Sequence, residues 1–138
     1  MKNLILTIAL VLSGSFGFSQ NEGITITVSI ENVQNDNGVV SFALHTKETF
    51  MKGAGVAGAQ SKIKDGKVLV TFENVQPGEY AIIALHDENE NNQMDYQANG
   101  MPKEAYGTTN NPMSFGPPQF NESKFTVADQ NLEFLIRF

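Results

Sequence analysis

One polar segment of the chain carries oxygen-bearing side chains at the spacing of a calcium-binding loop. Residues 86–95 read HDENENNQMD and contain the pattern D-x-N-x-N-x-x-x-D. Ca²⁺ takes roughly six to eight oxygen ligands, and short side chains on alternate residues of a tight loop supply them. The predicted metal ligands are Asp87, Asn89, Asn91, Gln93, Asp95 and Glu104. Gln93 would contribute its backbone carbonyl oxygen.

The segment departs from the helix-loop-helix calcium motif (the EF-hand) at two positions. The sixth position is usually Gly because the backbone there has positive φ, and here it is Asn92, the next most tolerant residue. The twelfth position is usually Glu, and here it is Ala98, so a bidentate carboxylate would have to come from Glu104 or Asp95. The segment also follows a predicted strand. We therefore expect a calcium loop on a β scaffold; the alternative is a solvated Asn/Asp-rich turn without metal.

Other catalytic or metal-binding patterns are weak. His45 and His86 are the only histidines, and they lack the H-x-x-x-H or H-x-H spacing of a zinc site. No G-x-S-x-G motif occurs. We predict no catalytic residues, no organic cofactor and no enzymatic activity. The alternative is a periplasmic small-ligand carrier or enzyme that uses the loop end around His86, Glu104 and Tyr106.

A glycine-rich segment matches the dinucleotide-binding pattern only in its letters. Gly53 to Gly58 reads G-x-G-x-x-G, but no strand is predicted to end immediately before it and no amphipathic helix follows. A dinucleotide site needs a helix N-terminus to hold the pyrophosphate. We interpret the segment as a flexible connection between strands.

Alternating hydropathy predicts the scaffold of this loop. In residues 24–30, apolar side chains alternate with Thr and Ser, which is typical of a half-buried strand. Residues 80–86 are apolar on both faces, which indicates a central strand. The other predicted strands lie in residues 39–46, 68–72, 124–127 and 132–138. With turns such as Asn35–Gly38, this pattern predicts an all-β fold, an antiparallel β-sandwich of about seven strands, immunoglobulin-like or transthyretin-like.

Two long connections do not fit the regular spacing of strands. Residues 47–60 are rich in Gly and Ala, and residues 87–123 form a long polar excursion. Connections of this length in a compact domain are usually functional or disordered. The excursion carries four aromatic residues, Tyr96, Tyr106, Phe115 and Phe120. They are expected either to cap the open end of the sandwich or to bind a glycan or protein partner.

The N-terminus and the composition indicate export. Residues 1–19 have a basic start, an apolar run and small residues before Gln20, the layout of a secretory signal peptide. The apolar run is too short to span a bilayer, so we expect no membrane span after cleavage and a single domain over residues 20–138, located in the periplasm or outside the cell. The net charge of −6 disfavours nucleic acid as a partner, and the absence of Cys excludes disulfides.

Three motifs in order resemble one known family. They are PGEYA at 77–81, HD-x-N-x-N-x-x-x-D at 86–95 and G-x-PKE-x-YG at 100–107. This trio resembles the domain-of-unknown-function family 2141, which comprises small exported bacterial β proteins, and the resemblance spans essentially the whole chain after the signal peptide. In that family Gly usually stands where this chain has Asn92. The resemblance implies a β-sandwich akin to transthyretin-like and carboxypeptidase-regulatory-like domains, and it implies no established activity.

Overall fold

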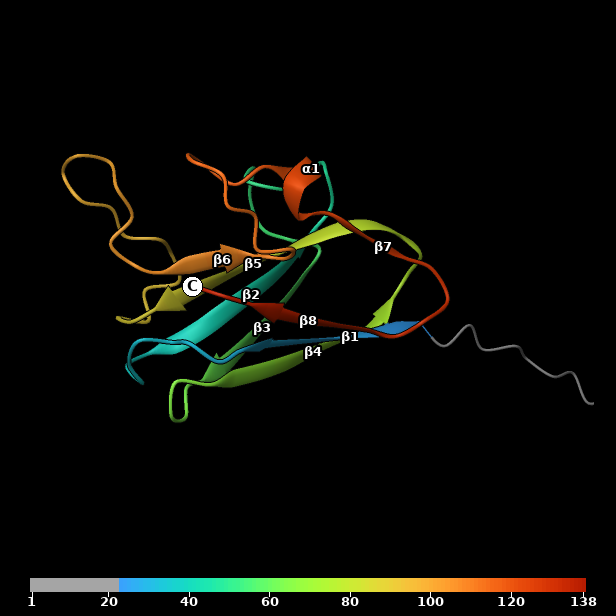
Figure 1. Cartoon of the computed structure of the whole chain (residues 1–138), viewed down its shortest axis with the longest axis horizontal. Coiled ribbons are helices and arrows are strands. Elements are labelled where there is room, and N and C mark those ends of the chain that lie inside the picture. Colours follow the sequence, from blue (N-terminus) through green and yellow to red (C-terminus); the bar gives the residue numbers. More distant parts are fainter. Residues whose placement is uncertain (1–22) are drawn as a thin grey trace, which may run out of the picture.

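The computed structural model describes residues 23–138, and the predicted signal peptide of residues 1–19 lies outside the described residues. The strands are β1 (Ile24–Ile30), β2 (Val39–His45), β3 (Ala57–Lys62), β4 (Val68–Val75), β5 (Gly78–Asp87), β6 (Tyr106–Thr108), β7 (Phe125–Val127) and β8 (Leu132–Ile136), and one short helix, α1 (Phe120–Ser123), precedes β7. They form two sheets, so the predicted all-β sandwich is confirmed (Figure 1). In the described part of the chain, no helix is long and apolar enough to cross a membrane.

The two sheets differ in size and in the direction of one pairing. The smaller sheet has the order β4-β1-β8, and the larger has the order β3-β2-β5-β6, with β7 paired to the first residues of β5. All pairings between strands are antiparallel except β1–β8, which is parallel. The chain crosses from the larger sheet at β7 to the smaller sheet at β8, where it runs beside β1 in the same direction.

The hydrophobic core lies between the sheets and follows the predicted alternation. Every second residue of β1, beginning with Ile24, is buried, and the residues between them are half-buried. In β5, which is central as predicted, Ile82, Ala84 and His86 face the core. Burial of a large aliphatic side chain stabilises a fold by about 1.5–3 kcal/mol. β5, the strand that ends at the predicted calcium loop, is also held on both sides by hydrogen bonds, to β2 and to β6.

Two strands lie inside the connections that were predicted to be irregular. β3 occupies the end of the Gly/Ala-rich connection and forms the edge of the larger sheet next to β2. β6 lies within the polar excursion and pairs with Ile83, Ala84 and Leu85 of β5. Both strands are short of large apolar residues, so their sequences show no period-two pattern.

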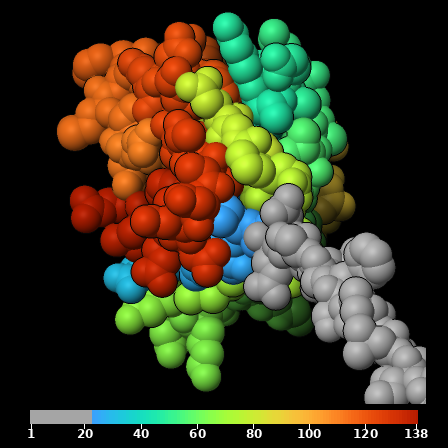
Figure 2. Space-filling view, turned by 90° about the vertical axis from the view of Figure 1, so that its right-hand side faces the viewer, coloured from blue at the N-terminus to red at the C-terminus, as the bar shows by residue number. Residues whose placement is uncertain are grey.

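The start of the first connection and the α1 part of the second pack over one end of the larger sheet, whereas residues 88–105 lie at the other end, after β5. The ring of Phe50 in the first connection lies 5.7 Å from the ring of Phe120 in α1. Figure 2 shows these segments, teal to green and orange to red, at the top of the molecule. Phe120 therefore caps the sandwich, whereas Phe115 is fully exposed. The prediction that the aromatic residues of the excursion cap the sandwich therefore holds for Phe120 and not for Phe115.

Candidate metal centre

Asp87 is the last residue of β5 and organises the loop that follows. Its side chain is completely buried. The backbone N–H of Asn91 donates to Oδ1 (3.2 Å), and the backbone N–H of Asn92 donates to Oδ2 (2.8 Å). One carboxylate thus folds the chain back on itself immediately after the strand, as the first residue of an oxygen-lined loop must do.

Three predicted ligands converge inside this loop. The side-chain amide of Asn89 donates to Asp95 Oδ2 (2.7 Å), and that of Asn91 donates to Asp95 Oδ1 (2.8 Å). The Asn89 and Asn91 side-chain oxygens also accept backbone N–H groups two residues further on, from Asn91 (3.3 Å) and Gln93 (3.2 Å). The third, fifth and ninth positions of the pattern therefore lie side by side, as the spacing predicts.

The backbone at the sixth position of the pattern has the conformation inferred from the sequence. Asn92 has φ of 62°, in the left-handed region that Gly and Asn tolerate best. Its side-chain oxygen accepts a hydrogen bond from Gln60 Nε2 (3.2 Å), which ties the tip of the loop to β3. The Gln93 carbonyl accepts no hydrogen bond from any residue between 23 and 138. It is available as a ligand at the seventh position.

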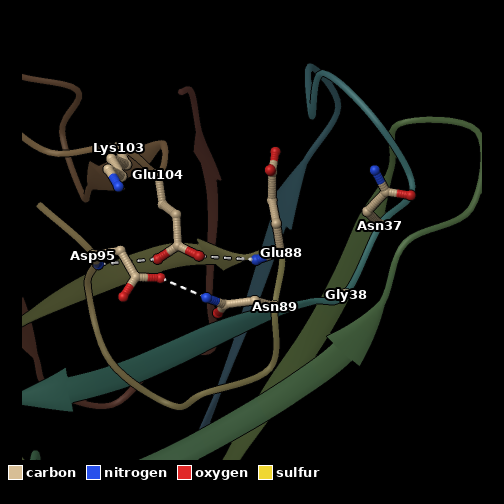
Figure 3. Close-up of a pocket in the computed structure, with 7 residues that line it drawn as sticks. All are labelled: Asn37, Gly38, Glu88, Asn89, Asp95, Lys103 and Glu104. Carbon is tan, nitrogen blue, oxygen red and sulfur yellow. Dashed lines mark hydrogen bonds between the residues drawn. The ribbon is translucent and has the colours of Figure 1, made fainter. Parts of the chain in front are cut away.

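Glu104 joins the two ends of the loop from outside it. Its carboxylate accepts the backbone N–H of Glu88 at Oε1 (3.2 Å) and that of Asp95 at Oε2 (3.3 Å), as Figure 3 shows. The side chain is buried. Through these two bonds, Glu104 positions the backbone at both ends of the loop.

The loop borders an open cavity of about 600 Å³ (Figure 3). The lining residues are Asn37, Gly38, Glu88, Asn89, Asp95, Lys103 and Glu104. Three carboxylates against one ammonium make this cavity acidic. Within residues 23–138, no three His, Cys, Asp or Glu side chains come close enough together to hold a metal ion. At most two carboxylates would therefore bind one cation here, and its other protein ligands would be amide and carbonyl oxygens.

The wall formed by Asn37 and Gly38 was not predicted as part of the site. Gly38 has φ of 67°, and a Cβ atom there would collide with the carbonyl oxygen of Asp87. Nδ2 of Asn35 also donates to Glu88 Oε1 (2.9 Å). The sequence signal was present as the turn Asn35–Gly38, but nothing in the sequence placed this turn against the end of β5.

The residues of the alternative catalytic hypothesis are divided between different surroundings. His86 is buried, its ring stacks on Phe138, and its Nε2–H donates to the Asn37 carbonyl (2.8 Å). Glu104 lines the acidic cavity, whereas Tyr106 lines a separate apolar cavity. His86 lines neither of these cavities. The three side chains do not form one site.

The glycine-rich segment is not a dinucleotide site. The segment Gly53 to Gly58 ends inside β3, which begins at Ala57, so in the described chain a strand and not a helix follows the first glycines. The segment therefore lacks the helix N-terminus that would bind pyrophosphate.

Comparisons with known proteins give a family and no function. No curated protein matches the chain. The model of the domain-of-unknown-function family DUF2141, described as "Uncharacterized protein conserved in bacteria", matches residues 28–134. This match covers more than half of the chain, so the protein belongs to that family of uncharacterised bacterial proteins.

Proposed function

We propose that this chain is an exported, non-catalytic β-sandwich protein that binds one Ca²⁺ ion in the loop after β5. Residues 87–95 would hold the ion, and the ion would fix the following segment, 96–104, against the larger sheet. The observation that carries the proposal is the convergence of the Asn89 and Asn91 side-chain amides on the Asp95 carboxylate.

The chemistry of these three side chains suits a hard cation. A side-chain amide carries its oxygen and its nitrogen on opposite sides, so a half-turn exchanges the donor for an acceptor. In the structure the amide nitrogens face Asp95. With the oxygens turned inward instead, two amides and a carboxylate would repel one another unless a cation lay between them. Ca²⁺ is the cation that accepts such a mixed set of oxygens in a flexible loop.

The remaining ligands indicate a site of low affinity. Gln93 would add a backbone carbonyl, while Asp87 and Glu104, whose carboxylate oxygens all accept backbone N–H groups of the loop, would offer only their remaining lone pairs. Calcium affinity rises with the number of charged ligands, and extracellular modules typically have dissociation constants of about 10⁻⁴–10⁻³ M. We expect a value in this range, which suits a protein exported into a calcium-containing medium.

The acid–base groups support a role without catalysis. Both oxygens of Glu104 accept backbone hydrogen bonds, and the buried His86 ring donates to a backbone carbonyl. These bonds engage both groups in holding the loop end of β5, and His86 lines neither of the two cavities described above.

A calorimetric titration of residues 20–138 with CaCl₂, after removal of metal by a chelator, tests this proposal. We expect one site in the wild type and no measurable heat of binding in Asp95→Asn. Asp129→Asn removes an exposed carboxylate from the turn before β8 and should bind as the wild type does. Equal calcium binding by the two variants, or none by the wild type, would refute the site.

A further inference from the structure

A second cavity of about 480 Å³ lies on the outer face of the larger sheet. Its floor is formed by Ile83 and Leu85 of β5, which point away from the core. Met94, Tyr96 and Met101, from the proposed calcium loop and the segment after it, also line the cavity. Its volume is within the range of small-molecule sites in proteins, about 300–1,000 Å³.

The composition of the lining indicates the charge of a ligand. Among residues 23–138, those that line this cavity include no Asp, Glu, Lys, Arg or His. Burying an unpaired charge among apolar groups is costly, so a neutral molecule is favoured. Methionine side chains adapt to irregular apolar shapes, and tyrosine combines an apolar ring with a hydroxyl.

Two tyrosine hydroxyl groups are available to such a ligand. Tyr96 and Tyr106 both line the cavity. Neither hydroxyl makes a hydrogen bond to any other residue of the described chain, whereas the third tyrosine, Tyr80, donates to the Gln76 carbonyl (2.9 Å). The cavity thus offers apolar surface together with two unused hydrogen-bonding groups.

A third cavity adjoins this one on the larger sheet. A neighbouring cavity of about 420 Å³ shares Leu85 with the first one and is lined mainly by small residues, among them Ser41, Ala43 and Gly55. Small side chains leave room above the strands. A ligand longer than the first cavity would pass over Leu85 to reach the neighbouring one.

From these observations we propose that the outer face of the larger sheet binds an uncharged, elongated apolar molecule that carries a hydroxyl or carbonyl oxygen. The apolar body would lie on Ile83 and Leu85, and the oxygen would bond to a tyrosine hydroxyl. This site is separate from the acidic cavity and does not require bound calcium, so either proposal can fail without the other.

The test uses residues 20–138 and the uncharged fluorescent probe N-phenyl-1-naphthylamine. We expect saturable binding of one probe molecule, displaced by dodecanol at lower concentration than by the charged dodecanoate. Met101→Glu places a carboxylate at the rim and removes one apolar contact, and we expect about a tenfold loss of probe affinity or more. Met113→Glu is the matched control, because Met113 is 99% exposed and lies outside the lining.

Both variants change exposed positions, Met101 being 59% exposed, so each should fold. Melting curves followed by circular dichroism would verify this. Loss of affinity in Met101→Glu alone supports the proposal. Absence of saturable binding by the wild type, an equal effect of the two variants, or preference for dodecanoate would overturn it.

Discussion

The proposed calcium loop provides the sharpest prediction, because its proposed ligand Asp95 can be altered without changing the core. Asp95 is only partly buried, and its carboxylate accepts both asparagine amides. Asp95→Asn removes one of at most two carboxylates and leaves a side chain of nearly the same size. The variant should therefore fold and lose most of the stabilisation by calcium.

The expected magnitude follows from ligand linkage. For a dissociation constant of about 10⁻⁴–10⁻³ M, about 10 mM Ca²⁺ stabilises the folded state by about 1.4–2.7 kcal/mol. The domain of about 119 residues, 20–138, has an unfolding entropy of about 0.25 kcal/mol/K at its midpoint. The melting temperature should therefore rise by about 6–11 °C in the wild type, and by less than about 2 °C in Asp95→Asn.

The assay compares the melting curves of four separate samples, which contain EDTA, about 10 mM CaCl₂, about 10 mM MgCl₂ or about 30 mM NaCl. The NaCl concentration matches the ionic strength of the calcium sample. The NaCl sample measures how far salt alone screens repulsion in the acidic cavity. Mg²⁺ demands stricter octahedral geometry and should produce a smaller rise. Asn91→Asp should lower the melting temperature in EDTA, because it faces Asp95 with a second carboxylate, and should enlarge the rise with calcium.

Three results would refute this reasoning. The first is a rise in NaCl equal to the rise in CaCl₂, which would indicate screening without a site. The second is an unchanged rise in Asp95→Asn. The third is an Asn91→Asp variant with the calcium response of the wild type, since an additional carboxylate among the ligands must strengthen binding.

Three further predictions concern positions that support the site or the sheet. Gly38→Ala should lower the free energy of unfolding, measured by urea denaturation, by about 2 kcal/mol or more. Gly100 also has positive φ but has open space around it, so Gly100→Ala should lower the free energy of unfolding by only about 1 kcal/mol. Equal losses in the two variants would contradict the close contact of Gly38 with Asp87. Asn92→Ala should cost about 1 kcal/mol, and Asn92→Gly should stay within about 0.5 kcal/mol of the wild type, because φ is 62° there. Burial lowers the pKa of His45 from 6.5, so the unfolded chain binds a proton more readily than the folded one. The free energy of unfolding should therefore fall as the pH drops below about 6.5, by up to about 1.4 kcal/mol per pH unit, and His45→Asn should show a smaller slope.

The strands that the sequence predicted are those with large side chains on a buried face. In β1 the alternation of Ile and Val with Thr and Ser is visible because one face packs in the core and the other does not. In β3 the residues are Ala, Gly, Ala, Gln, Ser and Lys, and the strand lies at an edge. Its place is determined by hydrogen bonds to β2, which no local pattern reveals.

The sequence predicted the features of the candidate site that depend on contacts within residues 87–95. It did not predict those that depend on contacts with other segments of the chain. The spacing from Asp87 to Asp95 placed the asparagines and the positive φ of Asn92 correctly, because these depend on neighbours within the loop. Glu104 was expected as a ligand, and its hydrogen bonds to the backbone of Glu88 and Asp95 reveal an additional positioning role. That role, like the contact of Gly38 with β5, depends on the tertiary fold.

The two proposed sites meet at one short segment. Asp95 faces the asparagine amides, while its neighbours Met94 and Tyr96 line the apolar cavity. The Asp95 carbonyl also accepts the backbone N–H of Lys103 (2.8 Å), which closes the hairpin that carries Met101. The apolar wall is therefore attached to the same residue that would bind the ion.

This attachment should couple the two ligands. An ion that fixes Asp95 would restrict the motion of Tyr96 and Met101 as well, and a ligand held between these side chains would in turn favour the ordered loop. Because coupling of this kind is reciprocal, calcium should tighten binding of the apolar ligand by the same factor by which that ligand tightens binding of calcium.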